Sequence, residues 1–314
     1  MGLTNSVDKV DENGRELLTY GTKDFPIAFF DDDLTIVKVP WHWHDELEIV
    51  IITEGTVNVH IANREFTLSA GEGYFANSGI LHSATLESKT GHQHALVFDP
   101  RTMAHPDDLI WNTYVEPLVD NHSLPFIRLS SSIPWQKEVL RYSDNAWTQG
   151  AYEKKDFPIN VRELLTKSFA IISSHMELLQ NESEYTDRYK KDELRIKKCL
   201  IFIENNYASS ISIDDIAKSA DISVSSCLRL FKDTLGTTPI KYLLKYRLQR
   251  ICEELEKEPE VTISNVVYAN GFSDATYFNR CFKKEYGITP TEYISKVVRL
   301  KSPMFVKYAV PNIH

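Results

Sequence analysis

Residues 226–242, SCLRLFKDTLGTTPIKY, return further along the chain as residues 277–293, YFNRCFKKEYGITPTEY. A constant spacing of 51 residues separates the matching residues: Arg229, Phe231, Lys232, Gly236, Pro239 and Tyr242 return as Arg280, Phe282, Lys283, Gly287, Pro290 and Tyr293. Upstream, Ile216–Ala217 returns as Val266–Val267 at a spacing of 50. The turn after these residues is therefore one residue longer in one copy than in the other. Self-similarity at a fixed period is typical of a duplicated supersecondary unit. The stretch from Ile211 to Tyr293 therefore predicts two copies of one unit.

Each copy carries the start and stop signals of two short helices followed by a longer one. In the first copy, Ser212 lies three residues before Asp215, which is the spacing of a capping box. Ser223 can cap the second helix, which ends at Gly236, and Ser273 takes the capping position in the second copy. Two short helices joined by a tight turn form the helix-turn-helix, whose second helix enters the DNA major groove. The sequence predicts an all-α C-terminal domain with two such units.

This compound pattern resembles the DNA-binding domain of the AraC/XylS family of transcription regulators. The resemblance covers residues 192–300 and rests on Gly271–Phe272, Tyr277–Phe278, Arg280, Phe282–Lys283, Gly287 and Thr289–Pro290. Two positions depart from the family pattern, since Cys227 replaces a usual leucine and Val267 a usual alanine. The resemblance implies a sequence-specific regulator that is not an enzyme. Its implied partners are double-stranded promoter or operator DNA and RNA polymerase.

The expected DNA contacts follow from helical geometry and from the family pattern. Phe231 and Phe282 are expected in the core, so Arg229 and Arg280, two residues earlier, lie off the buried face. The candidate DNA contacts are Val224, Ser225, Leu228, Arg229 and Lys232 in the first unit, and Ala275, Thr276, Asn279, Arg280, Lys283 and Lys284 in the second. The resemblance implies that Val224, Ser225, Leu228, Ala275, Thr276 and Asn279 approach base edges. Arginine can read guanine or grip phosphate, whereas the lysines are expected at phosphates. The alternative for the arginines is a surface ion pair with the nearby Asp233 or Glu285.

The N-terminal third has a different pattern. Residues 25–98 contain short β-branched or alternating segments, namely 47–53, 56–61, 65–68 and 94–98, separated by turn residues. Several short strands at regular spacing predict an all-β sandwich or small barrel.

Within this region, three histidines and one glutamate form a candidate metal site. His42, His44 and Glu48 share one strand parity, and His82 follows on a later strand. Such a ligand set suits a divalent transition metal. The spacing H-x-H-x(3)-E-x(6)-G, with the later Gly71, Gly79 and His82, resembles the cupin superfamily. Asn77 stands where that family usually has proline.

The alternative is that the same side chains line an effector pocket without a metal. The candidate pocket residues are His42, His44, Glu48 and His82 together with Trp43 and Tyr74. A cupin-like barrel is a common partner domain in the AraC/XylS family, and the resemblance suggests a sugar as the effector. Two other readings stay open: a metal-dependent cupin enzyme with an accessory DNA-binding module, and a barrel that serves only dimerisation.

The region between these domains predicts amphipathic helices at 107–119, 135–147 and 161–179, which pack against the barrel or form a homodimer interface. The predicted domains are a sensor barrel at 1–105, a helical segment at 106–180, a linker at 181–191 and a DNA-binding domain at 192–302.

Charge and cysteine usage agree with this division. Residues 1–189 carry 15 basic and 29 acidic residues, a net charge of −14, and residues 190–301 carry 19 and 15, a net charge of +4. This asymmetry favours an anionic partner for the C-terminal part. Cys199, Cys227, Cys252 and Cys281 lie in apolar helical patterns, which predicts reduced, buried thiols in a cytoplasmic protein. The sequence shows neither an apolar run of membrane-spanning length nor a signal-peptide pattern.

Overall fold

The computed structural model describes residues 2–4, 20–62, 64–121, 123–182, 187–257 and 262–301. The chain divides into two compact units, Met1–Leu194 and Arg195–His314, called the barrel unit and the helical unit below. Among the described residues, none of the helices combines the length and the apolar character needed to span a bilayer.

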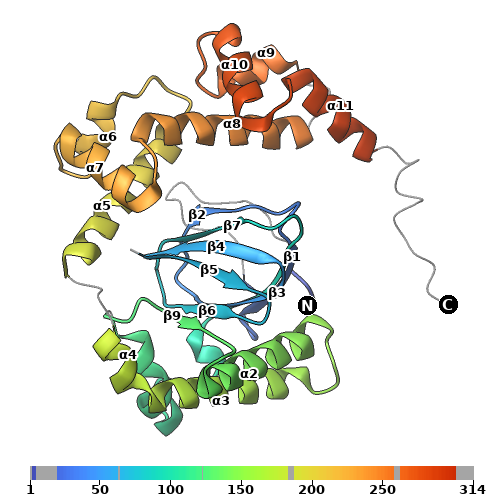
Figure 1. The fold of residues 1–314 in the computed structure, drawn as a ribbon, viewed down its shortest axis with the longest axis vertical. Coiled ribbons are helices and arrows are strands. Elements are labelled where there is room, and N and C mark those ends of the chain that lie inside the picture. Colours follow the sequence, from blue (N-terminus) through green and yellow to red (C-terminus); the bar gives the residue numbers. More distant parts are fainter. Residues whose placement is uncertain are drawn as a thin grey trace. The chain divides into compact units, whose positions relative to one another are not determined.

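Two antiparallel sheets form the barrel unit (Figure 1). The strands are β1 (Ile27–Asp33), β2 (Val39–His42), β3 (Leu47–Glu54), β4 (Thr56–Ile61), β5 (Arg64–Ser69), β6 (Gly73–Ala76), β7 (His82–Leu86), β8 (His92–Phe98) and β9 (Phe126–Leu129). One sheet has the order β1-β8-β3-β6-β9 and the other β2-β7-β4-β5. The predicted strand-rich N-terminal fold is confirmed. However, β9 lies inside the segment that was predicted to be helical.

The inner faces of the two sheets share one apolar core. Along β4, Val57, Val59 and Ile61 are fully buried, whereas the alternate residues Asn58 and His60 are only partly buried. This alternation is expected of a strand with one face toward the core. Val50 and Ile52 of β3 in the other sheet join the same core cluster. Polar residues of the same parity on the five-stranded sheet therefore also point between the sheets.

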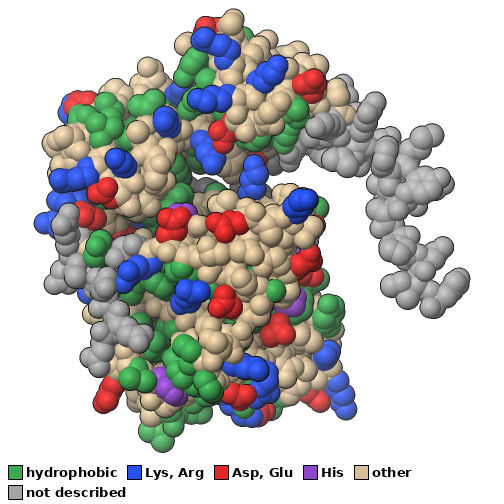
Figure 2. Space-filling model, viewed as in Figure 1, with side chains coloured by type: hydrophobic (Ala, Val, Ile, Leu, Met, Phe, Trp, Pro, Cys, Tyr) green, Lys and Arg blue, Asp and Glu red, His purple; other side chains and the backbone are tan. Residues whose placement is uncertain are grey.

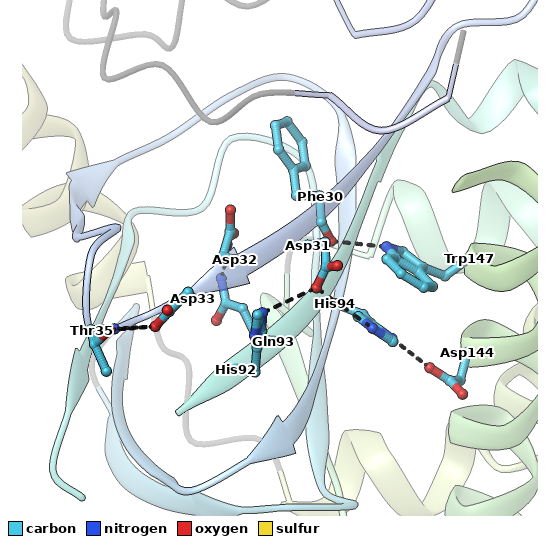
Figure 3. A network of polar contacts seen from close by, with 10 residues as sticks. All are labelled: Phe30, Asp31, Asp32, Asp33, Thr35, His92, Gln93, His94, Asp144 and Trp147. Carbon is cyan, nitrogen blue, oxygen red and sulfur yellow. Dashed lines mark hydrogen bonds and ion pairs between the residues drawn. The ribbon is translucent and has the colours of Figure 1, made fainter. Parts of the chain in front are cut away.

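The outer face of the five-stranded sheet packs against α2 (Pro134–Ala151) and α3 (Phe157–Ser174), which lie side by side in Figure 1. Gly150 permits a close approach of α2 to β1, because a Cβ there would lie 1.9 Å from Cζ of Phe29. Nearby, the indole Nε1 of Trp147 donates to the carbonyl oxygen of Phe30 at 2.9 Å (Figure 3). The ring of His94 stacks on Trp147 with centroids 3.4 Å apart. The helices are therefore joined to the sheet by both apolar packing and a directed hydrogen bond.

Between residues 106 and 180, two of the three predicted helices differ in extent from the helices of the structure. Of the predicted helix at 107–119, residues 109–119 are helical, but Trp111–Val115 form a π-helical segment, which is followed by the short α1 (Glu116–Val119). Pro117 accounts for the irregular hydrogen bonding, since it has no N–H to donate to the preceding turn. The predicted helix at 161–179 ends at Ser174, and α4 (Met176–Glu182) follows. At the break, the backbone N–H of His175 donates to Ile172, three residues back, instead of four.

The helical unit continues from α5 (Asp187–Asn206) through α6 (Ile213–Ser219), α7 (Val224–Leu235), α8 (Pro239–Lys257), α9 (Ile263–Ala269), α10 (Ala275–Tyr286) and α11 (Pro290–Lys301). The boundary between the two units falls within α5. Helix covers residues 181–182 and 187–191 of the predicted linker, and residues 183–186 lie outside the described part of the chain. The proposed domain limits stay predictions.

Most helix ends in this unit follow the sequence signals. Ser212 and Asp215 form the capping box of α6, and Ser223 accepts from the backbone N–H of Ser226 at 3.2 Å. The prediction for α10 was wrong by one residue, because its N-cap is Asp274, whose carboxylate accepts from Thr276 N at 2.7 Å. A carboxylate is the better partner for the positive end of a helix dipole than the hydroxyl of the preceding serine. The cysteines are free thiols, as expected, but Cys281 is only partly buried.

Candidate functional site

The barrel interior holds a buried cluster of three histidines and one glutamate. His42, at the end of β2, lies directly opposite His82, at the start of β7. His44 follows β2, and Glu48 lies on β3. All four are at most 8% exposed. One ring nitrogen from each histidine can be chosen so that the three atoms lie within 4.8 Å of one another. The structure thus brings together the four residues of the predicted metal site.

Backbone carbonyls fix the orientation of all three rings. The Nδ1 atoms of His42, His44 and His82 lie 2.8, 3.1 and 2.8 Å from the carbonyl oxygens of Pro40, Glu46 and Ile80. Because a carbonyl only accepts, each Nδ1 carries the proton and each neutral ring has its lone pair on Nε2. Metal-binding histidines usually have this arrangement, in which the second nitrogen donates to a neighbouring acceptor.

The carboxylate of Glu48 faces two of these Nε2 atoms. Its Oε2 lies 2.8 Å from Nε2 of His82 and 3.7 Å from Nε2 of His44. Since the Nδ1 proton of His82 is already donated, the 2.8 Å contact joins two acceptors unless a cation lies between them. That cation is either a proton, which makes His82 an imidazolium, or a metal ion.

Burial and the neighbouring charges act on the proton affinities of the cluster. Burial, followed by the charges of His82 and His44, lowers the pKa of His42 to about 3. Burial raises the pKa of Glu48, but if His82 and His44 carry protons on the Nε2 atoms that face it, the charge of His82 and the hydrogen bonds from both rings outweigh burial, and the pKa falls well below its ordinary value. A neutral histidine beside an ionised carboxylate is the state in which both can ligate a metal.

Further side chains line the same interior. Tyr74 on β6 is buried, with its ring centroid 6.4 Å from that of His82. Burial, together with the charges of Glu48 and Asp32, raises the pKa of Tyr74 well above 10. The ring of Tyr20, a residue that the sequence pattern did not single out, lies 5.5 Å from that of His44. Trp43 is buried as well, and its place in a ligand pocket stays a prediction.

A second polar pair on the inner face was also missed by the sequence reasoning. Nε2 of Gln93 donates to Oδ2 of Asp32 at 3.1 Å, and both residues are buried (Figure 3). The strand parity could have revealed them, because Asp32 shares the inward face of β1 with Phe30, and Gln93 shares that of β8 with Ala95.

In the helical unit, the predicted DNA contacts lie on the two helices that follow the tight turns. On α7, Ser225, Leu228, Arg229 and Lys232 are exposed, whereas Cys227, Leu230 and Phe231 are buried. On α10, the exposed residues are Thr276, Asn279, Arg280, Lys283 and Lys284, with Phe278 and Phe282 buried. Val224 and Ala275, which open the two helices, are partly buried.

The two helices thus present equivalent polar faces, and Figure 2 shows Lys and Arg side chains on the visible surface of this unit. Within the described residues, neither Arg229 nor Arg280 forms an ion pair with the predicted carboxylate. Glu285 instead pairs with Lys245 at 3.7 Å, and the guanidinium of Arg280 lies 5.8 Å from the ring centroid of Tyr277.

Comparison with known proteins assigns both units. Residues 26–106 match the model of the AraC-like ligand binding domain, and residues 216–296 match that of a helix-turn-helix domain. An uncharacterized HTH-type transcriptional regulator of Bacillus subtilis, YdeC, is 28% identical over 90% of this chain and 97% of its own length. The HTH-type transcriptional activator RhaS of Escherichia coli O1:K1 is 25% identical over 81% of this chain and 86% of its own length.

Among solved structures, an AraC-type DNA-binding regulator from Chromobacterium violaceum is 30% identical over 35% of this chain and 97% of its own, with a TM-score of 0.33. The matched domains and relatives are those of regulators, not of enzymes. The chain therefore belongs to the AraC family of DNA-binding transcription regulators and carries an N-terminal ligand-binding domain.

Proposed function

We propose that this regulator binds promoter DNA by placing the first turns of α7 and α10 in two successive major-groove segments. The observation that carries this proposal is the matching exposure of the two helices. Each is capped at its N-terminus by an oxygen-bearing side chain, buries its phenylalanine side chains, and exposes an arginine and at least one lysine on the other face. A helix N-terminus with nearby cations also attracts the DNA backbone.

The contacting residues are expected to divide into two groups. Arg229 and Arg280, with their neighbours toward the start of each helix, face base edges. Lys232, Lys283 and Lys284 lie further along the helices and hold phosphates. The two halves differ in sequence, since Val224, Ser225 and Leu228 correspond to Ala275, Thr276 and Asn279. The operator is therefore an asymmetric direct repeat.

The barrel unit is proposed to bind the small-molecule effector and to shift the population of DNA-competent arrangements. A buried polar interior within an apolar core is the usual composition of a small-ligand site. The resemblance to the family favours a sugar as the effector. His42, His44, Glu48 and His82 are proposed to hold a divalent transition metal there, because their Nε2 and carboxylate atoms converge on one point.

The cytoplasmic regulator is proposed to work as a homodimer that contacts RNA polymerase. Support for the dimer comes from exposed apolar side chains of the barrel unit, since Ile159 of α3 is 67% exposed and Leu109, before the π-helical segment, is 80% exposed. The polymerase contact and the cytoplasmic location rest on the family alone.

The DNA proposal is tested by selecting bound sequences from a random duplex library with the full-length protein, followed by footprinting. We expect two protected segments on one face of the duplex, about one helical turn apart from centre to centre. A protein in which Arg229→Ala and Arg280→Ala are combined should lose the selected sequence preference. Lys89→Ala, an exposed position in the barrel unit, is the control for the loss of a surface cation outside the two helices. A single protected segment that depends on only one of the arginines contradicts the two-helix arrangement.

A further inference from the structure

The two helix-turn-helix units are joined by a connection that can set their relative position. The inference drawn from this connection rests on the proposed function. In sequence, α8 alone joins the first unit (α6–α7) to the second (α9–α10). A single connecting helix leaves the ends on either side free to pivot unless other contacts hold them. The structure contains such a contact, made by the short segment that follows α5.

Residues 207–209 lie between α5 and α6, and Arg247 of α8 holds their backbone. Nε of Arg247 donates to the carbonyl oxygen of Tyr207 at 2.7 Å, and Nη2 donates to that of Ser209, also at 2.7 Å. The guanidinium thus satisfies two carbonyls at the C-terminal end of a helix, where intrahelical donors are missing. The Tyr207 ring also packs edge-on against Tyr246 of α8, with centroids 5.2 Å apart.

The second helix-turn-helix unit reaches the same segment from its α9–α10 turn. Gly271 in this turn has φ +80°, and a Cβ there would lie 2.6 Å from the carbonyl oxygen of Tyr207 and 2.9 Å from that of Ala208. The next residue, Phe272, is buried, and its ring centroid lies 6.0 Å from Cζ of Arg247. The turn therefore touches the backbone that Arg247 holds, and its aromatic ring lies beside the same guanidinium.

The segment is also tied to the first helix-turn-helix unit. It continues directly from α5, whose residues Ile196, Leu200 and Ile203 are fully buried. Cys199 of α5 donates through Sγ to the carbonyl oxygen of Ile216 in α6 at 3.6 Å. Any displacement of residues 207–209 would therefore be passed to α6 and α7.

We propose that Arg247 is a positioning residue that fixes the separation and relative orientation of α7 and α10. Together with the close approach of Gly271, it forms a second connection between the two units, parallel to α8. The two recognition helices then move as one body. DNA affinity consequently depends on the number of base pairs between the two half-sites, because each added base pair both lengthens and rotates the duplex.

The proposal is tested with Arg247→Lys and Gly271→Ala, which disturb the contact from opposite sides. Lysine keeps the charge but cannot supply two donors in a fixed planar arrangement. Alanine at position 271 must shift away from the carbonyls and adopt a left-handed conformation. Lys241→Ala, an exposed position on α8, is the control.

The first measurement is affinity for operators that carry one or two extra base pairs between the half-sites. For the wild-type protein we expect a loss of about tenfold or more per inserted base pair, on the scale of a mismatched base pair. In both variants the ratio of affinities for normal and lengthened operators should fall toward one, while binding to a single half-site is unchanged. An equal loss on every DNA, including the single half-site, would show that Arg247 only stabilises the fold and would overturn the proposal.

The second measurement needs no DNA, so it separates the failure of this proposal from failure of the proposed function. Asp233 in α7 and Ser264 in α9 are exposed, and each is replaced by p-acetylphenylalanine that carries a spin label. The distance between the two labels reports the separation of the two helix-turn-helix units. We expect one narrow distance distribution in the full-length wild-type protein and a broadened one in both variants. If both variants give distributions as narrow as that of the wild type, Arg247 and Gly271 do not fix the two units relative to each other. This result would overturn the proposal independently of any DNA-binding measurement.

Discussion

Oε2 of Glu48 lies 2.8 Å from Nε2 of His82, inside a barrel where both residues are buried. Because the other nitrogen of His82 donates to a carbonyl, this contact requires a shared proton or a metal ion. A proton serves only one such contact, whereas a metal ion can bind His42 and His44 as well. This difference is the geometric support for the metal ion proposed above.

The first prediction concerns metal content. Protein purified without chelator should contain about one divalent transition metal ion per chain, as expected of a site with histidine and carboxylate ligands. His82→Ala and Glu48→Gln should each lower that content severalfold or more, since each removes a ligand. Elemental analysis by mass spectrometry measures it. The control is His60→Ala, a partly exposed histidine whose Nε2 lies 3.2 Å from Glu65 on the surface. Equal metal content in all three variants and the wild type would leave the cluster as a pocket wall only.

The second prediction concerns pH in the metal-free protein. The pKa of His42 is lowered from 6.5 to about 3, so the unfolded chain takes up this proton well before the folded one. Between these values the unfolded state binds more protons, and the free energy of unfolding falls by up to about 1.4 kcal/mol per pH unit from this residue. The lowered pKa of Glu48 acts in the same direction, since its contribution is lost as the pH falls below its ordinary value.

This stability loss can be followed by urea unfolding with chelator at pH 7.5, 6.5 and 5.5. All five tryptophans precede residue 150, so their fluorescence reports the barrel unit alone. His42→Gln should flatten the decline with pH, and His60→Gln should not. Identical slopes for the wild type and His42→Gln would show that another group carries the pH dependence.

The clustering of the three histidines and Glu48 could be predicted from the sequence because their spacing is local. His42, His44 and Glu48 fall within seven residues and share one parity, and His82 has a fixed spacing from two turn glycines. Tyr20, Asp32 and Gln93 could not be found in this way, because no short spacing connects them to the cluster. Asp32 and Gln93 meet only because the sheet order places β1 beside β8.

The same limit explains the errors in the fold. The helix-turn-helix units are built from contacts over a few tens of residues, so their caps and periodicity identify them. Strand β9 pairs with β6, some fifty residues earlier, and four residues of alternating burial were not distinguished from a helical region. The break at His175 depends on tertiary packing, since its ring stacks on Trp135 of α2 with centroids 4.5 Å apart.

The third prediction concerns the joint between α2 and the sheet. Trp147→Phe keeps an aromatic ring beside His94 but removes the N–H that donates to the Phe30 carbonyl. Losing the partner of a buried acceptor costs about 1–3 kcal/mol. The midpoint of urea unfolding, followed by tryptophan fluorescence, should fall accordingly. Trp135→Phe is the control, because Trp135 lies on the same helix but is only partly buried. A smaller loss for Trp147→Phe than for Trp135→Phe would contradict this role.

The fourth prediction separates base reading from phosphate binding on α10. If Arg280 reads a base, Arg280→Ala should weaken binding to the selected operator by about 1–3 kcal/mol and relax specificity at one position. Binding to a scrambled duplex should change much less. Lys283→Ala should instead weaken binding to both DNAs alike and reduce the slope of log K against log salt by about one.

Mobility-shift titrations at three salt concentrations, with footprinting of both variants, distinguish these outcomes. Lys284→Ala, one residue further along the exposed face, tests whether the phosphate contact is shared between neighbouring lysines. If Arg280→Ala binds the operator as tightly as the wild type does, Arg280 is not a base-reading residue. Thr276 and Asn279 would then be the residues of α10 that contact base edges. If Lys283→Ala lowers only the specific affinity, then Lys283 contacts a base, and the division between arginine and lysine on this helix is wrong.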